Sequence, residues 1–135
     1  MYIREQLNQK VEVVHPLLPY ICSIDLVELF SPPYGSEAHA RNVVVFGDKQ
    51  FDRSPGGIGT CAKLATLYAK GKLVLGQDFI NESIIGTIFK GRVINETKVG
   101  DIPTVVTKIS GWAFITGIQQ FMCNPDDSLK FGFLV

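Results

Sequence analysis

The feature that most constrains this chain is a glycine-rich bend that leads directly into an apolar helix. The bend reads SPGGIG over residues 54–59, and TCAKLATLYAKG follows it. In that second segment Lys63, Thr66 and Lys70 form one narrow polar stripe, and nearly all other positions are apolar. So little polar surface is typical of a buried helix. Gly71 is a natural residue to end it.

Strand-like segments flank this helix on both sides. β-Branched and alternating patterns predict strands at residues 22–30 and 41–47 before the helix. The same patterns predict strands at 82–96, 104–110 and 112–122 after it, with a turn at 98–103. A short amphipathic helix is predicted at residues 2–10.

Glycines recur inside the later strand-like runs, at positions 86, 91, 111 and 117. Interior strand glycines indicate bulges, sharp curvature or close backbone approach. We therefore predict an α+β fold in which curved, mostly antiparallel strands wrap around one central buried helix. A length of 135 residues suits a single domain over 1–135.

Composition excludes several classes of function. Thirteen basic and thirteen acidic residues cancel without a basic stripe, which argues against a nucleic-acid partner. No apolar run reaches the roughly 18 residues of a membrane helix, and the first ten residues lack an apolar signal region, so we expect a cytoplasmic protein and no membrane partner. The three cysteines, Cys22, Cys61 and Cys123, form no CxxC pair. This pattern argues against a disulfide framework and a metal site, and favours reduced, mostly buried thiols.

The chain is rather apolar for its size, with 46% hydrophobic residues and a mean hydropathy of +0.19. Two interpretations remain open. The excess fills a dense core, or it forms a face that meets another domain or subunit.

The bend has the chemistry of an anion-binding site. A helix N-terminus presents unpaired backbone N–H groups and the positive end of the helix dipole, and glycines let a ligand approach the backbone. The segment lacks the Gly-Lys-Ser/Thr ending of a phosphate-binding loop and the GxGxxG pattern of a dinucleotide site. The alternative is a tight strand-to-helix turn in which Asp52 or Ser54 serves only as a local cap.

The identities of the residues in and around the bend are informative beyond their spacing. The segment NVVVFGDKQFDRSPGGIGTCAKLATLYAKGKL closely resembles the second-half signature of the proline racemase family. FINESIIGTIFKGRV, ITGIQQFMCNPDDSLKFGF and VVHPLLP also resemble family segments, in family order. That family includes proline racemases, 4-hydroxyproline 2-epimerases and trans-3-hydroxyproline dehydratases.

The resemblance implies a fold like that of diaminopimelate epimerase, with two similar lobes, the substrate between them and no cofactor. A thiolate from one lobe removes the α-proton, and a group from the other lobe returns a proton to the opposite face. The chain resembles the second, C-terminal lobe only, so the first lobe is expected to be absent from it. The implied partners are a proline- or hydroxyproline-like small molecule and either the missing lobe or a homodimer partner.

The resemblance also implies roles for single residues. Asp52 would accept a hydrogen bond from the substrate ring nitrogen, and the amides of Gly57, Ile58 and Gly59 would bind the substrate carboxylate. Phe46 would pack against the ring, although an ordinary core aromatic is the alternative for that residue.

Two positions depart from the family motif. Gly56 stands where racemases and epimerases have a reactive Cys and dehydratases typically have a Thr. Ile58 replaces a Thr and loses a hydroxyl. Cys61 lies five residues after Gly56, too far along a helix to substitute for it, and His15 and His39 are interpreted as structural.

Two functions follow. The first is a proline racemase-like isomerase, inactive as this chain alone because one lobe is missing and Gly56 cannot move a proton. The second is a non-catalytic module, derived from that lobe, that binds a small carboxylate or another protein. Which of the imino acids is bound depends on the missing lobe.

Overall fold

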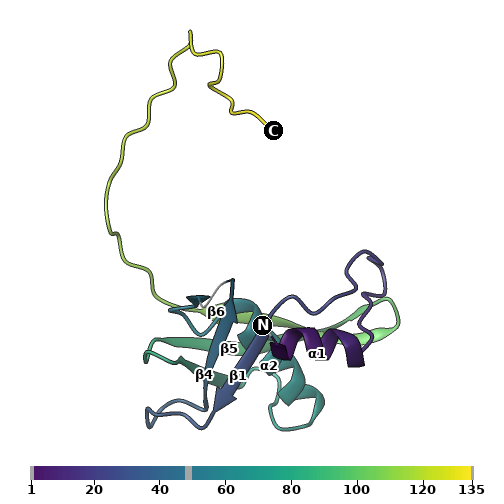
Figure 1. Ribbon diagram of the computed structural model, residues 1–135. Coiled ribbons are helices and arrows are strands. Elements are labelled where there is room, and N and C mark those ends of the chain that lie inside the picture. The colour runs from purple at the N-terminus through teal and green to yellow at the C-terminus, as the bar shows by residue number, and fades with distance from the viewer. Residues whose placement is uncertain (1, 48–49, 135) are drawn as a thin grey trace.

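The computed structural model describes residues 2–47 and 50–134 (Figure 1). Within them the chain forms two helices and six strands. In chain order these are α1 (Tyr2–Lys10), β1 (Val27–Ser31), β2 (Ala40–Phe46), β3 (Gln50–Phe51), α2 (Gly57–Ala69), β4 (Asp78–Ser83), β5 (Ile88–Val99) and β6 (Ile102–Ser110).

The strands form one mixed sheet in the order β1-β2-β4-β5-β6, and the short β3 pairs with β2. All pairs are antiparallel except the one between β2 and β4, which is parallel. A parallel pair needs a crossover connection, and the chain makes it through β3 and α2. This arrangement confirms the predicted α+β class with mostly antiparallel strands. The helix α2 begins at Gly57, so its first turn lies within the glycine-rich segment 54–59 rather than after it.

The core lies between α2 and the sheet. Leu64 on α2 is fully buried and packs with Leu73, Phe79 and Val93. Gly91 on β5 makes this packing possible, because a Cβ there would lie 2.7 Å from Leu64 Cδ1. The predicted close approach at a strand glycine is therefore confirmed at this position.

The helix is less buried than its apolar sequence predicts. Only Thr60 and Leu64 are fully covered on α2, and Ile58 is 85% exposed. The sheet covers one side of the helix, and the opposite side faces an open groove. The strands therefore cover the helix on one side only within the described residues, and the apolar residues on its other side have no covering layer.

Several predicted strand boundaries were wrong. β1 begins at Val27 rather than at residue 22. The predicted strand at 82–96 is a hairpin, in which β4 and β5 are joined by a turn at residues 84–87. Gly86 lies in that turn with φ +84°, and its N–H donates to the Ser83 carbonyl. The irregularity in the long β5–β6 ladder lies at residues 93–95, at no glycine.

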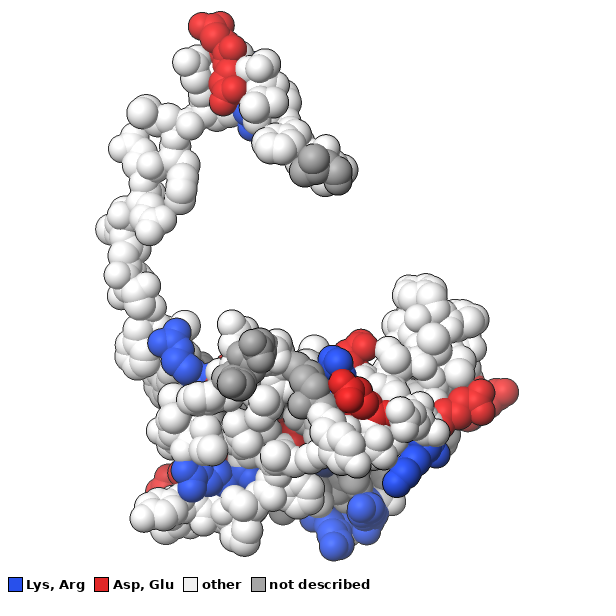
Figure 2. All heavy atoms as spheres, in the orientation of Figure 1, with Lys and Arg blue, Asp and Glu red and all other residues white. Residues whose placement is uncertain are grey.

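The predicted strand at 112–122 is absent. Residues 111–134 contain no strand and run away from the body as an extended tail (Figure 1). Trp112, Phe114, Ile118 and Phe121 are each more than 80% exposed. A strand needs a neighbour that accepts its backbone hydrogen bonds, and no described strand lies beside this segment. In Figure 2 the near part of the tail carries almost no charge.

The apolar composition is expressed largely at the surface. Exposed aliphatic and aromatic side chains gather on the tail and on β1. This distribution favours the interpretation that the apolar residues form a face for another domain or subunit over the interpretation that they fill a dense core. The cysteines are free, as predicted, but Cys22 and Cys123 are exposed and Cys61 is half-buried, so the prediction of mostly buried thiols was wrong. In the described part of the chain, no helix has the length and apolarity needed to cross a membrane.

Candidate functional site

The bend before α2 is built by two local turns. Asp52 Oδ1 accepts a hydrogen bond from the Ser54 N–H at 3.0 Å, and Ser54 Oγ accepts one from the Gly56 N–H at 3.1 Å. The side chains of Asp52 and Ser54 therefore accept backbone N–H groups within the turn, as the capping alternative from the sequence expected. Gly56 then takes φ 77° and ψ 117° as the residue that precedes the helix.

The first turn of α2 presents free backbone donors. The first intrahelical bond of the helix runs from the Thr60 N–H to the Gly56 carbonyl at 3.0 Å. The amides of Gly57, Ile58 and Gly59 precede that bond and so have no intrahelical acceptor. No described side chain caps them. We call these three amides the cradle; its donors and the helix dipole both favour an anion.

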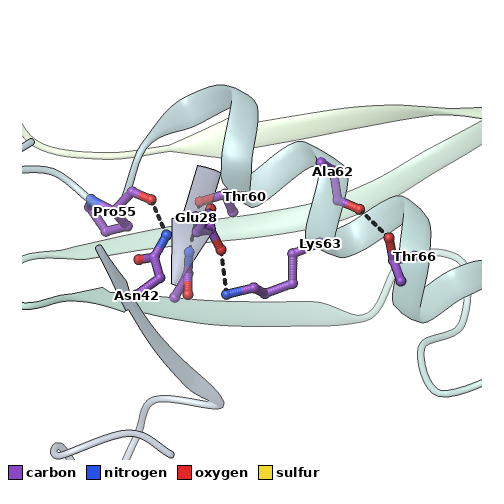
Figure 3. Close-up of polar contacts among 8 residues, drawn as sticks. Glu28, Asn42, Pro55, Thr60, Ala62, Lys63 and Thr66 are labelled. Atoms are coloured by element: carbon purple, nitrogen blue, oxygen red, sulfur yellow. Dashed lines mark hydrogen bonds and ion pairs between the residues drawn. The ribbon is translucent and has the colours of Figure 1, made fainter. Parts of the chain in front are cut away.

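Three side chains from the sheet and its turn hold the bend in place. Asn42 Nδ2 donates to the Pro55 carbonyl at 2.7 Å (Figure 3), and Asn81 Nδ2 donates to Thr60 Oγ1 at 2.9 Å. Thr87 Oγ1 donates to the backbone carbonyl of residue 53 at 2.6 Å. Asn42 and Asn81 are buried, so the backbone is anchored on the side that faces the sheet, while the cradle stays open on the other side.

These three anchors were not predicted from the sequence. A weak signal was present for Asn42, which directly precedes the apolar run VVVF, whereas Asn81 is followed by the polar residues Glu82 and Ser83 and carries none. A buried polar side chain in such a run must have a hydrogen-bond partner. The partners lie 13 and 21 residues away along the chain, so the pattern alone did not reveal them.

A groove of about 1170 Å³ runs along the open side of α2. It brings together all the residues predicted for the site, which are Phe46, Asp52, Gly56, Gly57, Ile58 and Gly59. Phe46 is 36% exposed and lines the groove. Asp52 is half-buried at the groove wall, where it can both cap Ser54 and face a ligand.

Gly56 brings no reactive group to the groove. A Cβ at that position would lie 3.3 Å from Val44 Cγ2, so the Val44 side chain leaves little room for a side chain at residue 56. Cys61 is half-buried and does not line the groove, which supports the prediction that it cannot substitute.

An ion pair lies in the groove wall. Lys63 Nζ and Glu28 Oε1 are 2.7 Å apart, and their side chains are 13% and 16% exposed (Figure 3). Lys63 also lies over the Phe30 ring, 5.1 Å from its centroid. The pair joins β1 to the second turn of α2 and was not predicted.

The two histidines have structural contacts. His15 Nδ1 accepts hydrogen bonds from the Leu17 and Leu18 amides, and His39 Nδ1 accepts one from the Ile80 amide at 2.9 Å. Both contacts agree with the structural roles predicted for them. Over residues 2–47 and 50–134, no three His, Cys, Asp or Glu side chains gather in a way that suits a metal ion.

Comparison with known proteins decides the family. A sequence model of the family described as proline racemase matches residues 1–134. The chain belongs to the proline racemase family. It is 51% identical over 135 residues to a proline racemase of Clostridioides difficile, covering 100% of this chain and 40% of that protein. It is 46% identical over 133 residues to a probable 4-hydroxyproline 2-epimerase of Rhizobium meliloti, covering 98% and 40%.

A solved structure of a family member has the same fold. The chain superposes on a hydroxyproline epimerase from Agrobacterium vitis, which has trans-4-hydroxy-L-proline bound, with a TM-score of 0.79 and 33% identity. The match covers 100% of this chain and 38% of that one. The chain thus spans about 40% of the length of the relatives that it matches.

Proposed function

We propose that this chain forms one side of a proline racemase-type site, which binds proline or hydroxyproline by its carboxylate and its amine. The observation that carries the proposal is the cradle at the start of α2, which opens into the same groove as Asp52. Membership of the family supports the ligand class. In this proposal residues 1–135 are a single domain that corresponds to the second lobe of the longer relatives.

The proposed binding mode uses three groups of this chain. The ligand carboxylate accepts hydrogen bonds from the amides of Gly57, Ile58 and Gly59 and gains from the helix dipole. Asp52 accepts a hydrogen bond from the ring nitrogen, and Phe46 packs against the ring. Because the anchors Asn42 and Thr87 fix the bend from below, the cradle needs no rearrangement to bind.

Catalysis is proposed to require more than this chain. Inversion at the α-carbon needs proton-transfer groups on both faces of the substrate. Residue 56 is a glycine, so this chain lacks a proton-transfer side chain at that position. A first lobe, or a second protein copy, would have to enclose the substrate and supply the other face.

The binding proposal is tested by NMR titration of the ¹⁵N-labelled chain with proline, 4-hydroxyproline and pyrrole-2-carboxylate. We expect the amide signals of residues 57–59 to shift together in a saturable manner, and those of the tail to stay unchanged. Saturable shifts elsewhere, with none in the cradle, would contradict the proposed site.

The catalytic part is tested by supplying a first lobe in co-expression and following deuterium exchange at Cα of proline and hydroxyproline. We expect exchange at no more than one face. Ready exchange at both faces would contradict the inference that Gly56 disables the site.

A second candidate is a non-catalytic module that binds a small carboxylate or another protein. Gly56 favours it, because the cradle and Asp52 are kept while the reactive side chain is not. The exposed apolar groove and tail are compatible with a protein partner. Titration calorimetry with the same three ligands, combined with ultracentrifugation, tests this candidate. No binding by a strictly monomeric chain would remove its support.

A further inference from the structure

The outer edge of β1 is open to a further strand. In the described part of the chain β1 pairs only with β2, and it forms one end of the strand order. An edge strand presents unpaired backbone N–H and C=O groups, which are a template for another strand. The five residues of β1 include one charged side chain, Glu28, and that charge is paired with Lys63. The described residues therefore place neither a strand nor an unpaired charge at this edge.

Hollows flank β1 on both faces of the sheet. Glu28 and Phe30 line the groove of about 1170 Å³ on the side of α2. Val27 and Leu29 alternate with them and line a second hollow of about 340 Å³, which α1 borders. Phe30 is 75% exposed and Leu29 is 48% exposed. Because side chains alternate between the faces of a strand, a strand added at this edge would place its side chains in the two hollows in turn.

The tail has the composition that such a strand requires. Residues 111–125 contain no charged side chain. In an extended chain Trp112 and Phe114 lie on one face, and Ala113 and Ile115 lie on the other, so both faces are apolar. Trp112, Phe114 and Ile115 are each more than 80% exposed. Pairing with β1 would give this backbone its hydrogen-bond partners and cover these side chains without burying a charge.

The topology of the sheet favours the tail of a second copy. β1 and β6 are opposite ends of the order β1-β2-β4-β5-β6, and the tail runs from the end of β6 away from the body (Figure 1). Crossing the four strand spacings back to β1 takes about 19 Å, or roughly six extended residues. Within one copy the first half of the apolar segment would be used for that crossing. In a second copy no crossing is needed.

We propose that residues 112–118 of one copy add as a strand to the outer edge of β1 in a second copy. Each copy carries both an edge and a tail, so the exchange is reciprocal and forms a closed twofold dimer. The added strand covers Phe30 on one face and Leu29 on the other. It also forms a second wall for the groove. This pairing concerns β1 and the tail, and it holds whether or not the cradle binds an imino acid.

Hydrogen exchange over a concentration series tests the pairing, with sedimentation velocity on the same samples. We expect the outward-facing amides of Val27–Ser31 and the amides of residues 112–118 to gain protection together as a dimer forms, by about tenfold or more. Protection of both segments in a monomer would place the tail on its own copy and overturn the exchange. A dimer without this protection, or a chain that remains monomeric at NMR concentrations, would overturn the pairing.

Charged substitutions distinguish this pairing from general apolar association. Ile115→Lys and Leu29→Lys each introduce a charge into the paired region, one from the tail and one from the edge. Each should raise the dissociation constant of the dimer by about tenfold or more. The controls are Phe131→Lys, at a 91% exposed position beyond the paired segment, and Val106→Lys, at a 40% exposed position on the other edge strand. Both controls should leave the constant within about twofold of the unchanged chain.

An equal mixture of ¹⁵N-labelled and unlabelled copies shows which copy supplies the strand. We expect isotope-filtered NOEs between tail side chains of the unlabelled copy and amides 27–31 of the labelled copy. A ¹⁵N–¹H spectrum of each variant confirms that it is folded, since all four substituted side chains are exposed in a single copy. If the four variants weaken the dimer alike, or if a dimer shows no such NOEs, the proposed exchange is wrong.

Discussion

Gly56 combines a missing side chain with a backbone conformation that suits glycine. Its φ of 77° lies in a region that residues with a Cβ seldom adopt. The Val44 methyl group, 3.3 Å from the absent Cβ, leaves little space for a larger residue. The glycine at position 56, where the family resemblance implies a reactive Cys or Thr, therefore affects the shape of the groove wall as well as its chemistry.

Restoring the family residue should be costly for this reason. We expect Gly56→Cys to lower the free energy of unfolding by about 1–3 kcal/mol, as for other non-glycine residues held at positive φ. Gly57→Ala is the matched control, because no atom lies within 4 Å of its Cβ position and its φ is not positive. Urea unfolding of both variants measures the difference. Equal stability of Gly56→Cys and the unchanged chain would show that the bend tolerates a side chain.

Asn42 is the residue whose loss should disturb the cradle from below. Asn42→Ala removes the donor to the buried Pro55 carbonyl, which we expect to cost about 1–3 kcal/mol. It should also weaken ligand binding, because the bend loses an anchor. Asn95→Ala, at an exposed position on β5, serves as the control and should change neither quantity by much. Calorimetric unfolding and ligand titration measure the two effects.

Among the elements, those with a complete local signal were predicted well. The helical stripe of α2 and its glycine stop lie within one stretch of sequence, and the turn between β5 and β6 has its own glycine. The β4–β5 hairpin was missed because its turn, IIGT, is mostly apolar and reads as part of a strand. Segments far away in the sequence decide on how many sides a helix is covered. The sequence of α2 alone therefore could not predict that only one of its sides is buried.

The contact between α2 and β5 is the packing interaction most sensitive to volume. A methyl group at residue 91 would lie 2.7 Å from Leu64 Cδ1, in the middle of the core. We expect Gly91→Ala to lower the free energy of unfolding by about 1–3 kcal/mol through overpacking. Gly117→Ala adds the same group where nothing lies within 4 Å and should be close to neutral. Parallel thermal and urea unfolding compares them, and a neutral Gly91→Ala would mean that the core adapts.

The loop before β2 is held by a carboxylate at the end of β4. Glu82 is buried, and its Oε2 accepts hydrogen bonds from the amides of Tyr34 and Gly35 at 2.8 and 3.1 Å. These two donors lower the pKa of Glu82, and the Arg41 charge nearby lowers it further. A carboxyl group with a lowered folded-state pKa stabilises the fold above its unfolded-state pKa. That stabilisation is lost as the pH falls through the folded-state pKa.

The Glu82 contact should therefore open in acid. We expect the amide signals of Tyr34 and Gly35 to change together at a pH below the ordinary glutamate pKa of about 4.3, and their hydrogen exchange to become faster there. Glu82→Gln should abolish this titration, whereas Glu37→Gln, in the same loop, should leave it in place. A transition of these two amides at or above the ordinary glutamate range would contradict the assignment.

For the whole molecule, the resemblance to a family predicted more than the sequence patterns did. It placed Phe46, Asp52 and residues 56–59 together, and the groove contains all of them. The strand pattern at 112–122 failed at this scale. The segment has apolar residues on both faces, as a strand between two layers would, but the described residues provide no layer on either side. The hydrophobic pattern of a segment shows which of its side chains could be buried. Whether they are buried depends on whether a neighbouring sheet or helix is present to cover them.

The tail should thus contribute little to the stability of this domain and much to its association. We expect removal of residues 112–135 to change the free energy of unfolding by less than about 1 kcal/mol, because Trp112, Phe114, Ile115 and Ile118 are all more than 80% exposed. The full chain should self-associate with rising concentration, since exposed apolar segments of this size drive association. The shortened chain should do so much less. Sedimentation velocity over a concentration series, with urea unfolding of both forms, measures the two properties. A shortened chain that loses cooperative unfolding would show instead that the tail packs on the domain in solution and closes part of the groove.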